Sequence, residues 1–448
     1  MKSVLLPYFD KVRGEIIPGA YRLQKLVSQW LDQGILNFPS VLVTGSNGKG
    51  STCAYLERIL REHKLKTGLY TSPHLVHPNE RIRINGIPVT ESILEENLIE
   101  IQVQVDLHLP DASFFEITTA TAFLIFLKEK IDFLVCEVGL GGHFDSTNSL
   151  APLLSIITSV SLEHCSYLGN SLKEIAADKS YIARRNKPFI VAPLPANALL
   201  GVRETAEKIG ANVIMVDSLL RQDPVIPCLS SPGLTGGSRE IALGPPVKPG
   251  DDNEPGDDNE PWDDNEQEDE CLNINLQTAL TAIKYLPFSF DKNKIKSAVD
   301  NTFWPGRFDV RMVKGREVIF DAAHNPDGFD FFFQQYLKSK FANKKCILLF
   351  ASLSDKDWES TLKKIPYLAE YVIFTQIESQ RSVPVEKFFN SIHKLKDPFP
   401  DFEICADLEI AVEKSMKMMP HLPLIMTGSI AFIGTVMEQL TIEVFPSV

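Results

Sequence analysis

Short apolar runs alternate with amphipathic helical segments along most of this 448-residue chain. The apolar run at 38–45 leads into a helical pattern at 51–64, and a helical pattern at 115–130 leads into the apolar run at 132–139. The same rhythm returns between residues 317 and 428. Strands that are apolar on both faces and separated by helices are typical of parallel sheets covered by helices on both sides. The alternation therefore predicts an α/β fold with two sheet-containing domains.

An acidic segment of low complexity interrupts this pattern. Residues 251–270 contain twelve Asp or Glu and no Lys or Arg, and the hexad PGDDNE is repeated there. Without these twelve acids the formal net charge of −13 becomes −1. Such a stretch buries too little apolar surface to offset its ordering entropy, so we predict a disordered insertion at about 227–270. The nearly neutral remainder gives no indication of a basic nucleic-acid surface.

The number and spacing of the cysteines, together with the hydropathy pattern, indicate the cellular compartment of the protein. The seven cysteines form no CxxC pair, and their odd number favours a reducing compartment over a disulfide framework. Residues 418–437 carry no charge but are interrupted by Pro and Gly, so they predict a buried strand followed by a helix and not a membrane span. We expect a cytoplasmic, monomeric protein that acts on small molecules, with no nucleic-acid or membrane partner.

The sharpest motif is VLVTGSNGKGST at 41–52, between a predicted strand and a predicted helix. Three glycines allow backbone N–H groups to surround an anion, and the following helix adds its positive end: Gly45, Gly48 and Gly50. Lys49 is expected to meet the β- and γ-phosphates, and the Ser51 hydroxyl to meet phosphate or Mg²⁺. The loop departs from the GxxxxGK[ST] pattern, and a glycine-rich turn with an unrelated lysine is the alternative. Its place between strand and helix favours nucleotide binding.

The loop resembles the phosphate loop of the Mur ligase superfamily, and five further blocks resemble its folylpolyglutamate synthase and dihydrofolate synthase branch. In chain order these blocks are TSPHLVHPNERIRING (71–86), FFEITTATAF (114–123), EVGLGGHFDSTN (137–148), PGRFD (305–309) and DAAHNP (321–326). Six blocks in the family's order are far more specific than one loop. The resemblance implies a P-loop ATPase-like domain with a parallel-rich sheet at 1–299, which contains the insertion, and a smaller Rossmann-like α/β domain at 300–448.

The same resemblance implies an ATP- and Mg²⁺-dependent ligase. It would add L-glutamate to the carboxylate of dihydropteroate or of a reduced folate through an acyl phosphate. Because a carboxylate is a poor electrophile, this reaction needs phosphate clamps, metal ions and a site that aligns acceptor and amine. Two alternatives stay open at this point: a Mur-type ligase with another acceptor, and a catalytically inactive nucleotide-binding scaffold.

Four residues are the implied ligands of two magnesium sites. Glu137 closes a predicted strand, and Ser72 and His164 each follow one, which is where open α/β sheets hold ligands. Lys179 matches a lysine that the family carries as a carbamate formed with CO₂. The alternatives are a turn serine, an ion-paired acid, a core histidine and a solvated lysine.

The remaining positions carried over from the family fall into three groups. The implied ATP-binding residues are Asn47, Gly48, Lys49, Gly50, Ser51, Asn275, Arg307, Asp321 and His324. The implied catalytic residues are Lys49, His164, Lys179 and Arg307, whose guanidinium suits a phosphoryl group in transfer. The implied acceptor-binding residues are Phe114, Phe115, Glu116, Phe144, Asp145 and Ser146. The two adjacent phenylalanines suit stacking on a pterin ring or packing in a helix core equally well. His143 departs from the family, which usually has Arg there, and Glu163 stands where Asp is typical.

Overall fold

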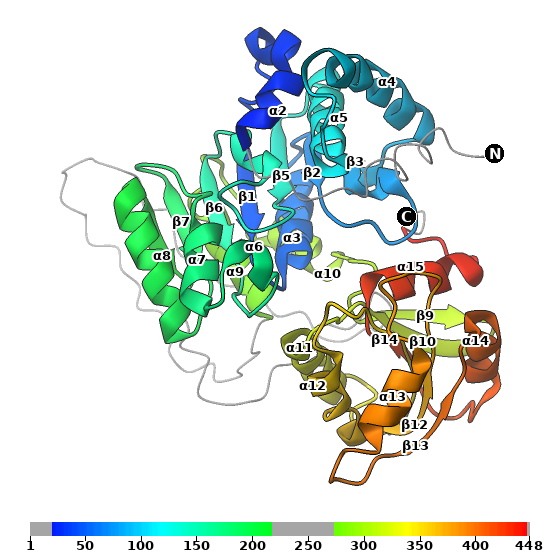
Figure 1. Cartoon of the computed structure of the whole chain (residues 1–448). Helices are drawn as coiled ribbons and strands as arrows, with labels where there is room; N and C mark the ends of the chain where they lie inside the picture. Colours follow the sequence, from blue (N-terminus) through cyan, green and yellow to red (C-terminus); the bar gives the residue numbers. More distant parts are fainter. Residues whose placement is uncertain (1–19, 217–272, 446–448) are drawn as a thin grey trace.

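Two β-sheets, each flanked by helices, form the two domains of the computed structural model (Figure 1). The structure describes residues 20–216 and 273–445. The predicted insertion at 227–270 therefore lies outside the described residues. The two α/β domains confirm the predicted fold class. The predicted division between residues 299 and 300 remains a prediction.

The N-terminal sheet is parallel through most of its width. Its strands are β1 (Ser40–Thr44), β2 (Thr67–Tyr70), β3 (Ile82–Ile84), β4 (Ile87–Pro88), β5 (Phe133–Glu137), β6 (Leu154–Ile157), β7 (Pro188–Val191) and β8 (Asn212–Met215). They lie in the order β4-β3-β2-β5-β1-β6-β7-β8. Neighbours from β2 to β8 pair in parallel, whereas β3 and β4 form an antiparallel edge.

Both faces of this sheet are covered because its strands are apolar on both sides. In β1, Leu42 points into one buried cluster, and Val41 and Val43 point into the other. The first face packs against α2 (Ala20–Leu26), α4 (Glu91–His108), α5 (Phe114–Glu129), α7 (Leu172–Ser180) and α8 (Ala196–Ile209). The second packs against α3 (Lys49–Glu62), α9 (Ile274–Ile283) and α10 (Lys292–Asp300). Short segments complete the domain: η1 (Ser28–Gln33), η2 (Pro78–Arg81), η3 (Ser146–Ser149) and α6 (Cys165–Leu168).

The C-terminal sheet repeats this layering on a smaller scale. Its strands are β9 (Asp309–Val313), β10 (Arg316–Asp321), β11 (Cys346–Phe350), β12 (Ala369–Phe374), β13 (Asp401–Ile404) and β14 (Leu424–Thr427), in the order β13-β12-β11-β14-β10-β9. All neighbours are parallel except β9 and β10. Its helices are α11 (Pro326–Lys338), α12 (Trp358–Leu362), η4 (Ile365–Tyr367), α13 (Val385–Ile392), α14 (Leu408–Lys417) and α15 (Ile430–Gln439). The strand and helix predicted within 418–437 are confirmed as β14 and α15.

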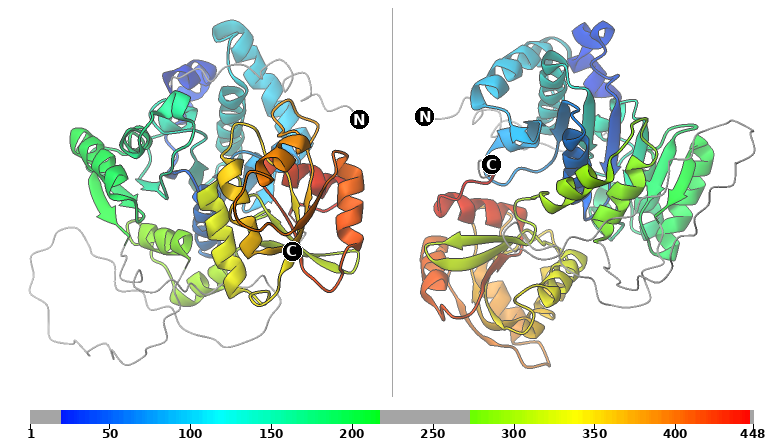
Figure 2. Two further views of the ribbon diagram at one scale, coloured as in Figure 1. Left: turned by 60° about the horizontal axis from the view of Figure 1, so that its bottom comes forward. Right: turned by 180° about the vertical axis from the view of Figure 1, so that it is seen from behind.

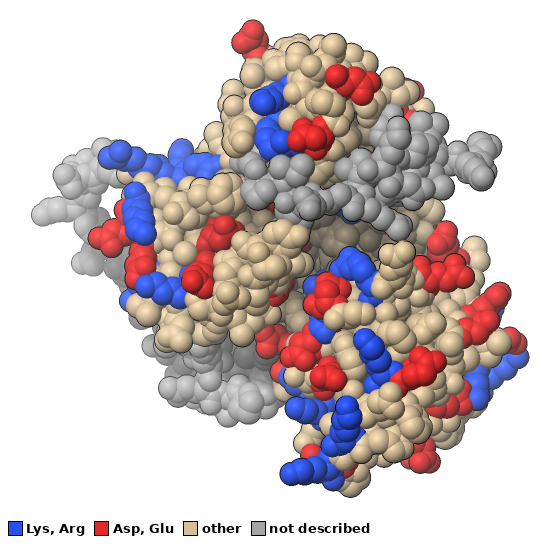
Figure 3. All heavy atoms as spheres, in the orientation of Figure 1, with Lys and Arg blue, Asp and Glu red and all other residues tan. Residues whose placement is uncertain are grey.

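Figure 2 shows the same layers from two further sides. On the face drawn in Figure 3, Lys and Arg side chains are interspersed with Asp and Glu on both domains. No helix in the two described stretches is long and apolar enough to cross a membrane. The five cysteines in these stretches are free thiols.

Candidate active site

A cleft of about 600 Å³ between the two domains collects most of the predicted site residues. Eleven of them line it: Asn47, Gly48, Lys49, Gly50, Ser51, Ser72, Glu137, His164, Lys179, Arg307 and His324. Eight do not: Phe114, Phe115, Glu116, Phe144, Asp145, Ser146, Asn275 and Asp321. Nine residues of the first group lie at or after the carboxyl ends of parallel strands, which meet at one edge of a sheet. The other two are Lys179, near the end of α7, and Arg307, in the turn before β9.

The phosphate loop connects β1 to α3, and its glycines are required by close contacts. Gly45 and Gly48 have φ angles of +147° and +87°, which L side chains rarely adopt. A Cβ on Gly45 would lie 2.0 Å from Oγ1 of Thr158, and one on Gly48 would lie 2.2 Å from Oδ1 of Asn275. The buried Asn275 at the start of α9 therefore lies behind the loop and supports it.

Lys49 is the first residue of α3, and its ammonium group is folded over the loop. Nζ donates hydrogen bonds to the carbonyl oxygens of Gly45, at 2.9 Å, and of Ser46, at 3.3 Å. These carbonyls hold the cation beside the backbone N–H groups that begin the helix. An anion bound there would meet both the ammonium group and the positive end of α3.

Asn47 makes a reciprocal amide contact across the cleft. Its Nδ2 donates to Oδ1 of Asn325 at 3.3 Å, and Nδ2 of Asn325 donates to Oδ1 of Asn47 at 3.2 Å. Asn325 also caps α11 by accepting from the Gly328 N–H at 2.7 Å. The phosphate loop is thus linked directly to the first turn of a C-terminal helix.

Ser72 and Glu137 are brought together at the ends of the neighbouring strands β2 and β5. The Ser72 N–H donates to Oε2 of Glu137 at 3.1 Å, and Glu137 is 5% exposed. Burial raises the pKa of Glu137, although the nearby cations Lys49, Arg307 and Arg83 oppose this effect. Within residues 20–216 and 273–445, no three His, Cys, Asp or Glu side chains converge on one point. A divalent ion held here would therefore need the Ser72 hydroxyl, water or phosphate oxygens as further ligands, which suits Mg²⁺.

Lys179 and Glu163 form a buried ion pair beside His164. Nζ of Lys179 lies 3.0 Å from Oε1 of Glu163, and Lys179 is 1% exposed. Burial lowers the pKa of Lys179. Burial acts to raise the pKa of Glu163, but the ammonium groups of Lys179 and Lys49 outweigh it and lower that pKa to about 2. His164 has a left-handed φ of 46°, and burial together with Lys356 lowers its pKa.

The C-terminal wall contributes Arg307 and His324, which a buried carboxylate supports from behind. Asp321 accepts hydrogen bonds from the N–H groups of Phe308 and Ala323, both at 2.8 Å, and so fixes the turn that carries Arg307. Burial raises the pKa of Asp321 to about 6. Nδ1 of His324 lies 3.0 Å from the Ala322 carbonyl, and burial lowers the pKa of His324 to about 4. His324 is therefore neutral at pH 7.

The predicted acceptor residues Phe114 and Phe115 lie just behind the lining of the cleft. The Arg81 guanidinium is 5.2 Å from the Phe114 ring centroid, and its Nε donates to Nδ1 of His74, a lining residue, at 2.9 Å. A Cβ on Gly139, another lining residue, would be 2.4 Å from the Phe115 ring. Both rings thus support the residues that face the cleft.

Glu116 has a structural place at the start of α5. It is 2% exposed, accepts from the Ser113 backbone N–H at 2.7 Å and pairs with Arg22 at 2.7 Å. These contacts satisfy its carboxylate completely within the domain core.

The segment 143–146 forms a separate aromatic stack. His143 lies 3.9 Å from the Tyr181 ring centroid and 4.1 Å from that of Phe144, which is 52% exposed. Asp145 and Ser146 are buried. Asp145 accepts from the N–H of Thr147 at 3.0 Å, so it caps η3.

Sequence reasoning missed Lys356, which lies in the loop after β11 and lines the cleft. Its field lowers the pKa of both His164 and His324, which places it near the two histidines. Arg381 and Ser429 line the same wall. A lysine in the loop that follows the apolar strand at 346–350 was the available signal, because the ends of parallel strands hold ligands.

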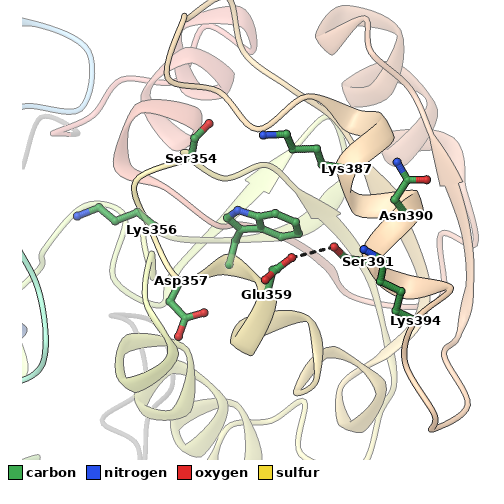
Figure 4. A pocket seen from close by; sticks show the side chains of 9 residues that line it. Ser354, Lys356, Asp357, Glu359, Lys387, Asn390, Ser391 and Lys394 are labelled. Atoms are coloured by element: carbon green, nitrogen blue, oxygen red, sulfur yellow. Dashed lines mark hydrogen bonds between the residues drawn. The ribbon is translucent and has the colours of Figure 1, made fainter.

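A second hollow of about 530 Å³ lies wholly on the C-terminal domain (Figure 4). Trp358 is among its lining residues, and α13 with the residues just after it contributes Lys387, Asn390, Ser391 and Lys394. Glu359 accepts a hydrogen bond from the Ser391 hydroxyl at 3.0 Å across it. Lys356 lines both hollows, but none of the predicted site residues lies in this one.

The chain matches two family models: "Mur ligase middle domain" over residues 43–218, and "Mur ligase, glutamate ligase domain" over 306–429. A relative from Bacillus subtilis (strain 168), named dihydrofolate synthase/folylpolyglutamate synthase, is 28% identical over 428 residues, which cover 94% of this chain and 95% of the relative. An Escherichia coli (strain K12) relative of the same name is 28% identical over 353 residues, which cover 78% and 76%.

Two solved structures extend the likeness to three dimensions. E. coli FolC in complex with DHPP and ADP has a TM-score of 0.77 at 25% identity and covers 97% of this chain and 96% of its own. The bifunctional folylpolyglutamate synthase/dihydrofolate synthase from Yersinia pestis, complexed with AMPPNP and Mn ion, has a TM-score of 0.76 at 25% identity, with coverages of 98% and 97%.

Proposed function

Because the chain belongs to the folylpolyglutamate synthase/dihydrofolate synthase family of the Mur ligase superfamily, we propose a role for each residue in the reaction of this family. The protein is an ATP-dependent ligase that joins L-glutamate to dihydropteroate, to reduced folates or to both. One observation carries the assignment of roles. A single cleft joins the phosphate loop, Glu137, His164 and Lys179 of the N-terminal domain to Arg307 and His324 of the C-terminal domain.

The first step forms an acyl phosphate. A carboxylate oxygen of the acceptor attacks the γ-phosphorus of ATP, and the bond from that phosphorus to the bridging oxygen breaks to release ADP. Lys49 leaves the carbonyls of Gly45 and Ser46 and contacts the phosphates, while the Ser51 hydroxyl donates to them. Arg307, on the opposite wall, stabilises the negative charge on the phosphoryl group in transfer.

The second step forms the amide. The glutamate ammonium group first loses one proton to water, and the resulting amine attacks the acyl carbon. The bond from that carbon to the phosphate oxygen breaks, inorganic phosphate leaves, and the nitrogen loses its second proton to water or to the departing phosphate. Lys356, Arg381 and Ser429 offer two cations and a hydroxyl on the C-terminal wall, which suits the carboxylates of glutamate. The neutral imidazole of His324 lies on the same wall and does not repel the incoming amine.

A divalent metal ion would complete the site, and Ser72, Glu137 and His164 are the residues that we propose would hold it. Such an ion offsets phosphate charge during transfer. The Ser72 hydroxyl and the Glu137 carboxylate come from neighbouring strand ends, and both are the hard oxygen donors that Mg²⁺ prefers.

We further propose that Lys179 is carboxylated and helps to hold a second metal ion. The reaction removes one proton from the neutral amine and forms a bond from Nζ to the carbon of CO₂. Burial favours the neutral amine, which supports the proposal. The carbamate would stand beside Glu163, so a cation between the two anions is required. A carbamate resonance after addition of ¹³C-labelled bicarbonate, lost in Lys179→Ala, would test it.

The decisive assay measures glutamate-dependent ADP release from ATP and Mg²⁺, with dihydropteroate and tetrahydrofolate in parallel. Turnover with either acceptor that disappears in Lys49→Ala is the expected result, and the ratio of the two rates gives the preferred acceptor. ATP binding without turnover on either acceptor would instead support the inactive scaffold or a ligase with another acceptor.

A further inference from the structure

Arg83 is a buried arginine on β3, which lies between β2 and the edge strand β4, and it is outside the lining of the cleft. It is 5% exposed, and no described residue accepts a hydrogen bond from its Nε. Its guanidinium lies between two rings, 4.5 Å from the centroid of Trp304 and 3.9 Å from that of Phe445. A cation between two aromatic faces is attracted by both, and more strongly where water is excluded.

Arg83 keeps its charge in this position. Burial lowers its pKa to about 10, while the carboxylates of Glu80, Glu57 and Glu137 oppose the effect. A pKa of this size leaves the guanidinium protonated at neutral pH. The attraction to the two rings is therefore present under working conditions.

The Trp304 ring connects Arg83 to the catalytic machinery in two ways. A Cβ on Gly50 of the phosphate loop would lie 2.9 Å from Cζ2 and Nε1 of Trp304, so the indole lies directly against the start of α3. The Trp304 carbonyl accepts a hydrogen bond from the Arg307 N–H at 3.3 Å. Trp304 therefore touches the loop that receives phosphate and begins the turn that carries Arg307.

The Phe445 ring connects Arg83 to the C-terminal domain. Arg311 on β9 donates to the carbonyl oxygens of Glu443, at 3.2 Å, and Val444, at 3.0 Å. Asp309 fixes Arg311 through a contact of 2.6 Å from Oδ1 to Nε. The residue before Phe445 is thus attached to the C-terminal sheet, while the Phe445 ring packs on a strand of the N-terminal sheet.

We propose that Arg83 is a positioning residue for phosphoryl transfer: held between Trp304 and Phe445, it keeps the turn 304–307 against the phosphate loop with Arg307 facing the cleft. The proposal rests on the function and on the role of Arg307 proposed above. A side chain that only stabilised the fold would change the thermal midpoint of unfolding. A positioning residue also changes kcat in the folded enzyme.

Arg83→Met tests this, because methionine keeps an apolar stem and removes the cation. We expect kcat for glutamate-dependent ADP release to fall about tenfold, with KM for the acceptor within about twofold of wild type. Arg316→Met is the matched control. Arg316 is 6% exposed and donates to carbonyl oxygens of residues 415–422 behind the C-terminal sheet. Its loss should lower the thermal midpoint and leave kcat of the folded enzyme unchanged.

A second pair of variants changes the ring and not the buried cation. Phe445→Tyr keeps an aromatic face and should retain the wild-type kcat. Phe445→Leu fills similar space without an aromatic face, so its kcat should fall as it does in Arg83→Met. The double variant Arg83→Met/Phe445→Leu should be no slower than Arg83→Met, because each of the two substitutions removes the same contact between Arg83 and Phe445. Wild-type kcat in Phe445→Leu, or an Arg83→Met variant that behaves like Arg316→Met, would overturn the inference. An inactive wild type would instead count against the proposed function.

Discussion

A methyl group added at Gly434 tests how closely the two domains must approach. Gly434 lies in the middle of α15 and lines the cleft. A Cβ built on it would be 1.9 Å from the carbonyl oxygen of Leu75 and 2.7 Å from the carbonyl carbon, whereas ordinary van der Waals contact begins at 3.4 Å. Both atoms belong to the backbone and cannot rotate away. Gly434→Ala therefore forces α15 and the segment around Leu75 apart by about 1 Å or more.

Two opposing effects follow, and they act on different measurements. Alanine in place of a helical glycine favours the helix by about 1 kcal/mol, so α15 itself becomes more stable. Leu75 follows Ser72 by three residues, so the displacement reaches the proposed metal and phosphate contacts. A shift of about 1 Å in a positioned catalytic group costs on the order of 100-fold in rate. We expect kcat/KM for ATP to fall by about that factor without a loss of helix content.

The assay pairs steady-state ADP release with thermal unfolding followed by circular dichroism. Gln439→Ala is the control, because Gln439 is exposed on the same helix and outside the lining of the cleft. Both variants should keep native helix content, and only Gly434→Ala should lose activity. If Gly434→Ala retained wild-type kcat/KM, the close approach of α15 to Leu75 would not belong to the active arrangement.

Three further perturbations address the cleft itself. Lys49→Ala should lower kcat/KM for ATP about 100-fold or more, because the ammonium group meets the phosphates; an unchanged value in the ADP-release assay would remove Lys49 from the site. As the pH rises from 5 to 7, the free energy of unfolding should fall by about 1 kcal/mol more in wild type than in Asp321→Asn. The reason is that the Asp321 carboxyl keeps its proton up to about pH 6 in the native state, whereas in the unfolded chain it releases the proton near pH 3.8. Urea titrations at both pH values measure this, and equal losses would contradict the buried, protonated state. A double-mutant cycle of Asn47→Ala and Asn325→Ala should show a coupling of about 1–2 kcal/mol for the two reciprocal hydrogen bonds, and purely additive changes in stability would mean that the contact is not formed in solution.

The sequence predicted those parts of the site that depend on local pattern and on the geometry of parallel sheets. The motif at 41–52 has the expected strand, loop and helix. Ser72 and Glu137, separated by 65 positions, were both assigned to strand ends, and they meet through a hydrogen bond. No tertiary information was needed, because parallel neighbours place their carboxyl ends at the same edge.

Features that depend on packing between segments were beyond this reasoning. Asn47 was assigned to ATP from its motif, but its partner Asn325 is 278 positions away and belongs to the other domain. Glu116 and Asp321 lie in recognisable blocks, yet the structure uses one as a helix cap and the other to support a turn. A motif identifies positions where the residue type is constrained. Only the contacts in the structure distinguish a side chain that faces the substrate from one that holds the surrounding backbone in place.

The charges that line the cleft link nucleotide binding to the approach of the two domains toward each other. Lys49 comes from the N-terminal wall, where Glu137 and the ion pair of Glu163 with Lys179 also lie. The described residues of the C-terminal wall include Arg307, Lys356 and Arg381 with the single acid Glu438. The C-terminal wall is therefore positively charged overall, and burial together with Lys356 lowers the pKa of His164 on the other wall. A polyanion between the walls is attracted by these cations on one side, and by Lys49 and the positive end of α3 on the other, so both walls attract the same phosphates. ATP is therefore expected to draw together the walls whose contacts, at Gly434 and at Arg83, align Arg307 for transfer.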